Sequence, residues 1–389
     1  MRYLTIIFLI FFYHIAATQP LRDINFNYLY NPDEPVSLTI NPIKLPDNWK
    51  VFFNLSLKDT TGGLQNYQIQ WEEREALNSK EGKVVFLSEG HLLIATNEGY
   101  WGFINIPLSD NQKILVGKVV NKSLKKAWNY YVILENNYPV TNYVRIGETP
   151  VVQKFIKTNQ AVGLNTEYTD GIISYYNDNF PPAAPAFSET QGRVSRGMKA
   201  DSVYSITRDS DFQFTQKGLY LVQNDTLSSQ GFCIRAEEDY PRYSKVQNLV
   251  GPFIYICSKQ EYDRLEAANG DKKIFDRTVL GITADEERAK KLIRNYFRRV
   301  ELANQYFTSY KEGWKTDRGM IYIIFGLPNQ VFKFYDREVW RYKNDSFDVT
   351  FNFSKASSIF DPDNYVLIRD KKYQETWYQV VDLWRNARF

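Results

Sequence analysis

The chain has 389 residues, of which 43% are hydrophobic and 16% aromatic, with 48 Lys and Arg against 45 Asp and Glu. A formal net charge of +3 leaves no electrostatic footprint for nucleic acid, so we expect no nucleic-acid partner. The hydrophobic fraction is ample for buried cores, and the length predicts two or three domains.

Residues 1–18 have the layout of a secretory signal peptide. Arg2 precedes an apolar run from Leu4 to Phe12, and small residues follow it. This run is too short to span a bilayer as a mature helix, and no other window is long enough, so we expect no transmembrane span in the mature chain. The chain has two histidines, His14 and His91, and the first would leave with the signal peptide. Mechanisms that need two histidines are therefore excluded, and we expect no metal and no cofactor.

Residues 19–146 are predicted to form an antiparallel β-sandwich of the immunoglobulin-like kind. Short runs of alternating polarity, among them "VFFNLSL" and "YWGFINI", follow one another at regular spacing with turn clusters between them. In the first of these runs Phe53, Leu55 and Leu57 share one face. The tryptophans of this region are expected in the core or at the rim of the sandwich.

Residues 147–258 are predicted to form a second, smaller sandwich from runs such as "GIISYY", "GLYLVQ", "GFCIRA" and "PFIYIC". Between the first two runs, a proline-rich segment cannot continue a ladder, so it is expected to be a long surface loop or a strap across the sheet. Cys233 and Cys257 lie in two of the predicted strands. Export would permit a disulfide between them, and the alternative is two buried free thiols.

Residues 259–389 change period and are predicted to form an α+β domain, with a long amphipathic helix on a small antiparallel sheet. Ser258 with Glu261 and Thr283 with Glu286 match the capping-box pattern that starts a helix. The second helix is expected to reach about Tyr310. Its apolar stripe comprises Ala289, Ile293, Tyr296, Val300, Ala303 and Phe307. The runs "MIYIIF", "VFKFY", "EVWRY", "FDVTFNF" and "NYVLI" predict strands, and a terminal helix follows.

Two charged patterns in this region have an ordinary structural interpretation beside a functional one. Asp361 and Asp363 in "FDPDNY" hint at calcium but lack the further ligands and the glycine of a calcium loop, so a turn is favoured. A basic strip on the long helix could meet anionic lipid or an acidic partner, and a solvated face balanced by glutamates is favoured. The strip comprises Lys290, Lys291, Arg294, Arg298 and Arg299.

The stretch "GWKTDRGMIYIIFGLPNQ", from Gly313 to Gln330, holds the densest set of special residues. Gly313 is expected to end the long helix in a left-handed conformation, and Trp314 to be buried at the corner between helix and sheet. Thr316 is expected to accept hydrogen bonds from backbone N–H groups in the turn, and Gly319 to let the chain turn into a strand. The following turn is assigned to Gly326 and Pro328.

Asp317 and Arg318 are the groups in this stretch that could carry chemistry. A catalytic interpretation makes Asp317 an acid or base, with Arg318 holding an anion and Tyr322 assisting. The sequence offers no adjacent nucleophile, histidine or evident carboxylate partner, so a structural role is favoured. If the stretch also binds something, Asp317, Arg318 and Trp314 are the candidate binding residues.

The same stretch resembles the signature of the GWxTD-domain proteins: Gly-Trp-x-Thr-Asp-Arg-Gly, an apolar segment, then Gly-x-Pro. The preceding "YFRRVELANQYF", the later "REVWRYKN" and the earlier "YYNDNFPPAAPAFS" resemble this family too. One departure is that Asn329 and Gln330 stand where an acidic residue is common. The resemblance implies an exported protein of bacteria with an outer membrane, and it implies no established activity. The expected location is the periplasm or the outer membrane, with the cell surface as a further option.

The leading hypothesis is a non-catalytic subunit of an envelope or outer-membrane protein complex. It rests on the export signal, the scarcity of catalytic groups and the predicted multi-sandwich layout. A glycan-binding module is one alternative, since aromatic faces stack on sugar rings. An enzyme centred on Asp317 and Arg318 is the other.

Overall fold

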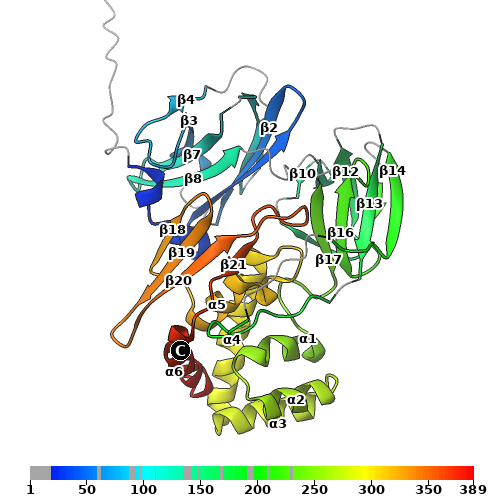
Figure 1. The fold of residues 1–389 in the computed structure, drawn as a ribbon, viewed down its shortest axis with the longest axis vertical. Helices are drawn as coiled ribbons and strands as arrows, with labels where there is room; N and C mark the ends of the chain where they lie inside the picture. The colour runs from blue at the N-terminus through cyan, green and yellow to red at the C-terminus, as the bar shows by residue number, and fades with distance from the viewer. Residues whose placement is uncertain are drawn as a thin grey trace, which may run out of the picture.

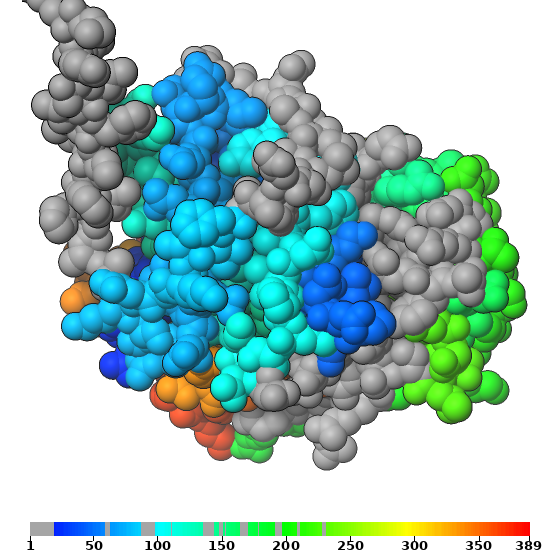
Figure 2. All heavy atoms as spheres, turned by 90° about the horizontal axis from the view of Figure 1, so that it is seen from above, coloured from blue at the N-terminus to red at the C-terminus, as the bar shows by residue number. Residues whose placement is uncertain are grey.

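The computed structural model describes residues 19–58, 63–86, 93–96, 98–109, 111–134, 142–147, 149–151, 153–166, 170–177, 179–190, 197–207, 211–227 and 231–389. Within these ranges five sheets and a group of helices form three modules (Figure 1). Figures 1 and 2 show the two β-rich modules next to each other on one side of the C-terminal domain. The expected signal peptide and His91 lie outside the described residues.

The first module is a sandwich of two four-stranded antiparallel sheets, as predicted. One sheet has the order β1-β2-β6-β5 and the other β4-β3-β7-β8. Side chains on β2 alternate between core and surface, with Phe53, Leu55 and Leu57 buried among Trp71 and Trp128 of the facing sheet. The strands are β1 (Val36–Lys44), β2 (Asn48–Leu57), β3 (Tyr67–Arg74), β4 (Lys83–Val84), β5 (Leu93–Thr96), β6 (Gly99–Pro107), β7 (Lys113–Asn121) and β8 (Lys126–Leu134), and the 3₁₀-helix η3 (Leu64–Asn66) precedes β3.

The middle module is a second sandwich, with sheets in the orders β10-β9-β12-β15 and β11-β17-β16-β13-β14. All pairs are antiparallel except β11 with β17, which run parallel. Val144, Val162, Ile173 and Ile234 meet in the core between the two sheets. The strands are β9 (Asn142–Ile146), β10 (Thr149–Pro150), β11 (Phe155–Lys157), β12 (Ala161–Thr166), β13 (Asp170–Tyr176), β14 (Ser202–Thr207), β15 (Asp211–Gln213), β16 (Gly218–Gln223) and β17 (Phe232–Glu237).

The C-terminal domain packs helices against the antiparallel sheet β18-β19-β20-β21. The last four predicted strands and the terminal helix are confirmed. The strands are β18 (Gln330–Lys333), β19 (Arg337–Lys343), β20 (Asp348–Lys355) and β21 (Tyr365–Leu367). The helices are α1 (Val246–Val250), α2 (Lys259–Ala267), α3 (Lys272–Thr283), α4 (Glu286–Phe307), α5 (Asp317–Phe325) and α6 (Gln374–Arg385), with 3₁₀-helices η4 (Gly251–Tyr255), η5 (Gly313–Lys315) and η6 (Lys371–Tyr373).

Both predicted module boundaries shift in the structure. The boundary at residue 146 falls after β9, yet β9 pairs with β12 of the middle sandwich, so that sandwich begins by Asn142. The boundary at residue 258 falls after α1 and η4, although Val250 and Phe253 lie in the core of the C-terminal domain. The sequence of a short segment does not show which module's core its apolar face packs in, because the contacting residues are distant in sequence.

Two predicted strands are helical. "MIYIIF" is the body of α5, and "PFIYIC" begins in η4. A short, continuously apolar run has no periodicity to separate a buried strand from a buried helix. Met320, Ile321, Ile323 and Ile324 are fully buried on α5, so this helix is apolar on every side.

The predicted helix starts are half confirmed. The capping box of Ser258 and Glu261 is present at the start of α2. The second one is wrong: Thr283 ends α3, and Asp285 caps α4 by accepting a hydrogen bond from the Arg288 N–H. The long helix then ends at Phe307, short of Tyr310, and its predicted stripe faces the core, with Tyr296, Val300, Ala303 and Phe307 buried.

The proline-rich segment bridges two modules. Its described part, residues 179–190, is called the proline strap here. Phe180 packs among Tyr176 of the middle sandwich and Tyr310 of the C-terminal domain, with 4.9 Å between the ring centres of Phe180 and Tyr310. Further along, the Ala186 carbonyl accepts a hydrogen bond from the Asp370 N–H. The strap therefore lies against the C-terminal domain, which is a more specific position than the one predicted.

The N-terminal segment of the described chain also bridges two modules. It contains the 3₁₀-helices η1 (Leu21–Asp23) and η2 (Asn27–Tyr30). The Phe26 N–H donates to the Val331 carbonyl on β18, and the Phe26 ring packs on Tyr131 of the first sandwich. Residues 19–30 thus hold the first sandwich against the C-terminal sheet.

Candidate functional site

The signature opens with η5, which lies directly on α4. A Cβ atom on Gly313 would stand 2.1 Å from the Ala303 carbonyl oxygen, so only glycine fits. The Trp314 N–H donates to the Asn304 side chain over 3.0 Å. The expectation that Gly313 ends the long helix in a left-handed conformation is wrong. The helix has already ended, and this glycine allows two backbone segments to touch.

Trp314 is buried at the corner between helices, with 6% of its surface exposed. Its indole N–H donates to the Tyr243 hydroxyl over 2.9 Å, and the Tyr255 hydroxyl donates to its carbonyl over 2.9 Å. Trp314 therefore fills the space between α4 and η4, and its polar atoms are satisfied. This leaves no exposed aromatic face at the position proposed for binding.

Thr316 is the N-cap of α5, with its hydroxyl accepting from the Gly319 N–H over 3.0 Å. A Cβ atom on Gly319 would lie 1.9 Å from the Gly313 carbonyl oxygen. Gly319 was expected to let the chain turn into a strand. It instead sits in the first turn of a helix, where it makes room for the preceding turn.

The turn after α5 is confirmed at the predicted residues. Gly326 has φ +83°, and the chain passes Pro328 to enter β18 at Gln330. Arg299 of the predicted basic strip lies here, donating to the carbonyls of Ile323 and Ile324. A cation beside the carbonyls at the C-terminal end of a helix stabilises that end.

The rest of the basic strip is partly neutralised. Lys290 pairs with both Glu286 and Glu287, and Arg298 pairs with Glu301. These contacts support the predicted solvated face over a lipid-binding strip.

Asp317 is one half of a buried ion pair. Its carboxylate receives the Arg369 guanidinium, with 2.5 Å between Nη2 and Oδ1, and the Leu367 N–H over 2.7 Å. Arg369 also donates to the Ala184 carbonyl of the proline strap. Asp317 therefore joins α5 to the segment after β21, and through Arg369 to the strap.

Arg318 points to a different partner. Its guanidinium lies 3.0 Å from Glu338 on β19, which is 0% exposed, and it donates to the Asp363 carbonyl. Tyr30 of the N-terminal segment donates to the other oxygen of Glu338 over 2.6 Å. Asp317 and Arg318 thus do not form one acid–anion site. Tyr322 is engaged as well, because its hydroxyl donates to the Tyr30 carbonyl.

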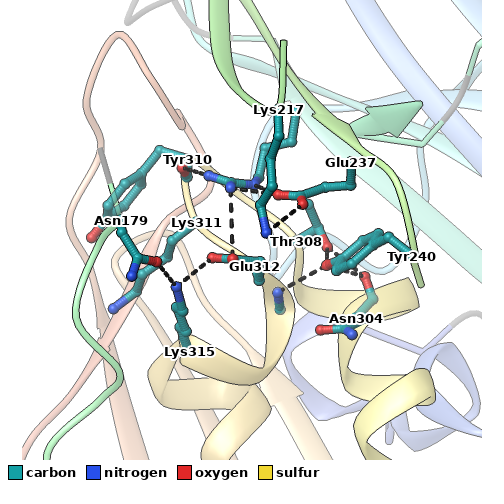
Figure 3. A network of polar contacts seen from close by, with 12 residues as sticks. Asn179, Lys217, Glu237, Tyr240, Asn304, Thr308, Tyr310, Lys311, Glu312 and Lys315 are labelled. Atoms are coloured by element: carbon teal, nitrogen blue, oxygen red, sulfur yellow. Dashed lines mark hydrogen bonds and ion pairs between the residues drawn. The ribbon is translucent and has the colours of Figure 1, made fainter. Parts of the chain in front are cut away.

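A second polar cluster surrounds the residues just before the signature (Figure 3). Arg235 of β17 makes two hydrogen bonds to Glu237, donates to the Tyr310 carbonyl over 2.8 Å, and lies 3.7 Å from Glu312. Lys315 lies 3.0 Å from the other oxygen of Glu312. Although burial opposes its charge, Arg235 and Lys315 hold the pKa of Glu312 well below its usual value. This cluster joins the middle sandwich to the turn at η5.

Figure 3 also shows Tyr240, Thr308 and Asn304, which hold the turn between α4 and η5. The Tyr240 hydroxyl bonds the Thr308 hydroxyl and accepts from the Gly313 N–H, the latter over 3.1 Å. Asn304 donates to the Pro241 carbonyl over 2.8 Å. Their partners lie far away in sequence, so no local pattern indicated Arg235, Glu312 or Tyr240 as site residues.

Beside the signature lies a cavity of about 300 Å³. One wall is the proline strap at Pro181 and Pro182, and the opposite walls carry Tyr310, Lys311 and Asp317. Burial lowers the pKa of Lys311 from 10.5 to about 8, while Asp317 partly opposes this shift. The cavity is the candidate binding site of this chain.

The two cysteines are free thiols, so the disulfide is not formed. Cys233 lies on β17 and packs in a cluster with Phe180 and Tyr310, whereas Cys257 packs against the core of the C-terminal domain. Burial raises the pKa of Cys257 to about 12, and it raises the pKa of Cys233 further. Both therefore act as small apolar side chains, which was the alternative.

Asp361 and Asp363 form a turn, as favoured. The Asp361 carboxylate pairs with Lys154 of the middle module over 2.8 Å and accepts from the Asp363 N–H. Among the described residues no group of three or more His, Cys, Asp or Glu side chains is arranged to hold a metal ion. In the same part of the chain no helix is long and apolar enough to cross a membrane.

All eight tryptophans are buried, and none exceeds 6% exposure. They are Trp49, Trp71, Trp101, Trp128, Trp314, Trp340, Trp377 and Trp384. Stacking on a sugar ring needs an exposed aromatic face. The tryptophans, which would make the best sugar-stacking surfaces, thus pack in the interior of the protein.

Comparison with known proteins finds a family match for the C-terminal part of the chain. The family model of the GWxTD domain matches residues 218–386. No curated protein matches the chain. Among solved structures, the titin Ig tandem domains A164-A165 match with 8% identity and a TM-score of 0.18, covering 52% of this chain and 96% of that one. A TM-score this low carries no argument, so the sandwich assignment stands on the paired sheets described above.

Proposed function

The family model of the GWxTD domain matches residues 218–386 of this chain, and from that premise we propose that the protein is a non-catalytic, exported cell-envelope protein. It acts as a protein–protein interaction subunit of an outer-membrane-associated complex. The observation that carries the proposal is that the polar side chains in and beside the signature are engaged within the chain. Asp317, Arg318 and the adjacent Glu312 are each engaged in a buried pair. The pair of Glu312 with Arg235 connects two modules, while the strap and Tyr30 reach the other two pairs by hydrogen bonds.

The buried pairs favour a rigid body over an active site. Arg318 and Glu338 receive Tyr30 from the N-terminal segment, and Glu312 lies beside Arg235 of the middle sandwich. The carboxylates of Asp317, Glu338 and Glu312 are therefore engaged by cations and donors of the chain itself. A three-module body held in one arrangement presents a large, preorganised surface, which lowers the entropic cost of binding a protein partner.

The two alternatives lose their main support. The enzyme hypothesis placed its chemistry on Asp317, Arg318 and Tyr322, and all three side chains are engaged by groups of this chain. The glycan hypothesis relied on aromatic platforms, and the tryptophans that would build the best ones are buried.

The proposal is tested by recovering the full-length protein from native envelopes after chemical crosslinking. An affinity tag is placed between residue 18 and Gln19, because the C-terminal Phe389 stacks on Trp384. We expect a fixed set of envelope proteins in constant ratio, identified by mass spectrometry. Recovery of the monomer alone would contradict the proposal.

A matched pair of variants connects this result to the structure. Glu338→Gln removes the buried partner of Arg318, whereas Asp263→Asn removes the exposed partner of Lys259. We expect the first variant to recover less partner per molecule of folded protein, and the second to behave like the unmodified chain. Equal recovery by both would show that the joint between modules does not matter for binding.

A further inference from the structure

The cavity beside the signature has one feature that the contacts within the chain do not explain. Lys311 lies in its wall, and its ammonium group reaches one weak acceptor, the Pro181 carbonyl at 3.4 Å. No carboxylate of the described residues lies within ion-pair distance of it. The neighbouring Lys315 is different, because it is paired with Glu312. Lys311 is therefore a largely buried cation without a counter-charge.

The other charges of the cavity cancel. Asp317 and Arg369 face it as one ion pair, in which Asp317 also accepts from the Leu367 N–H. With one negative and two positive side chains, the wall keeps a net charge of +1. A dianion such as phosphate usually draws on several cations or a guanidinium fork. One uncompensated ammonium matches a monoanion.

The remaining surface selects size and polarity. Pro181 and Pro182 of the strap, Tyr310 and Val366 supply apolar walls, and Asn364 supplies a polar side chain. A volume of about 300 Å³ is at the small end of ligand pockets. It fits a short acid or the last residues of a peptide.

We propose that this cavity binds the carboxylate of a small organic acid or of a peptide chain end, with the Lys311 ammonium as its anchor. The site is independent of the proposed function, since a carboxylate can bind the isolated chain whether or not that chain joins an envelope complex. A small organic acid and a peptide chain end both present a carboxylate, and probes with and without a peptide chain distinguish between them.

The titration of Lys311 gives the site a pH dependence. The groups around it are Asp317 of α5, Glu312 just before η5, Lys315 at the end of η5, and Arg369 after β21. Burial is the largest cause of its lowered pKa. A bound carboxylate needs the protonated amine. Binding should therefore be full below pH 8 and weaken by about ten-fold per pH unit above it.

The test uses the full mature chain and an NMR titration with three probes. These are sodium propionate, N-acetyl-Ala-Ala as the free acid, and N-acetyl-Ala-Ala-amide. We expect the acids to bind and the amide not to. Similar affinities for the two acids would indicate a small-acid site, and a clear preference for the peptide acid would indicate recognition of a chain end.

Lys311→Met keeps the length of the side chain and removes the charge. We expect it to weaken acid binding by about ten-fold or more, the usual value of a charge-assisted hydrogen bond. Lys259→Met is the control, since Lys259 is exposed and lies on α2. The proposal is overturned if neither acid binds, if Lys311→Met binds as well as the unmodified chain, or if inorganic phosphate binds more tightly than both acids.

Urea unfolding checks whether Lys311→Met folds, and it gives an independent readout. Because the folded pKa is lowered, the unfolded chain binds more protons between pH 8 and 10.5, so the stability of the unmodified chain rises with pH in that window. Below pH 8 the cost of the buried charge is fully present. Lys311→Met should be the more stable protein at pH 7, and its advantage should shrink as the pH rises past 8. A constant difference across this window would show that Lys311 is not the buried cation that the proposal requires.

Discussion

At the scale of single residues, the adjacent side chains of Asp317 and Arg318 have different partners and different structural roles. Asp317 pairs with Arg369, which is 52 positions away, and Arg318 pairs with Glu338, which is 20 positions away. Both pairs are buried, so both carboxylates are already engaged by groups of this chain. The sequence could identify these residues as special, but not their partners, because the partners come from β19 and from the segment after β21.

The buried pair of Asp317 and Arg369 predicts a specific pattern of stability. Asp317→Asn keeps an acceptor for the Leu367 N–H but removes the negative charge that faces the buried Arg369, so we expect a loss of about 3–5 kcal/mol. The double variant Asp317→Leu with Arg369→Met removes both charges and should recover more than half of that loss. Urea unfolding measures all three proteins.

Asp263→Asn is the matched control for the Asp317 variants, because it breaks the exposed pair with Lys259. We expect it to cost less than about 1 kcal/mol. A stable Asp317→Asn protein would mean that the Arg369 pair contributes little, and the case for a functional Asp317 would reopen.

At the scale of elements, α5 organises the C-terminal domain. It lies against α4 and against β21, and eight of its nine residues are buried. Its apolar run carries no amphipathic signal because it has no solvent-facing side. What makes it a helix is the Thr316 cap and the contacts on all its faces.

The close approach of η5 to α4 predicts that Gly313 cannot be replaced. A Cβ atom would meet the backbone of Ala303 and Asn304, which cannot move without shifting α4. We expect Gly313→Ala to cost about 3 kcal/mol or more, at the upper end of overpacking effects. Calorimetric melting temperatures give the measurement.

Gly281→Ala is the opposite case within the same domain. Gly281 lies in α3, and a Cβ atom there meets nothing within 4 Å. We expect this variant to be stabilised by up to about 1 kcal/mol, because alanine is the better helix former. If the two variants behaved alike, the contact between η5 and α4 would not be as tight as described.

At the scale of the whole molecule, apolar contacts cross between the modules. The cluster around α5 includes Leu21 and Phe26 of the N-terminal segment, Ile114 of the first sandwich and Ala186 of the strap. A smaller cluster joins Tyr176 of the middle sandwich to Tyr310 of the C-terminal domain, so apolar surface as well as buried pairs connects the three modules. This continuity predicts that the described body unfolds in a single transition.

Tyr30 tests this coupling. It reaches Glu338 through its hydroxyl, Tyr322 through its carbonyl, and Trp340 through its ring, with 5.1 Å between the ring centres. We expect Tyr30→Ala to lose about 3–5 kcal/mol and to split the calorimetric transition into two. Tyr204→Ala, on the exposed strand β14, should leave one transition with nearly the same midpoint. A single transition in Tyr30→Ala would show that the first sandwich is held by other contacts.

The sequence by itself determined the local features: most strands of both sandwiches, the cap of α2, the stripe of α4, the terminal helix and the GWxTD signature. These depend on periodicity and on neighbours a few positions apart, which a sequence displays directly. The tertiary structure alone decided that "MIYIIF" is a helix, that Gly313 and Gly319 serve close backbone contacts, and where each module begins. It also decided that Lys311 stands without a counter-charge. Burial, pairing and steric fit are properties of residues that meet in space, and here those residues come from three modules.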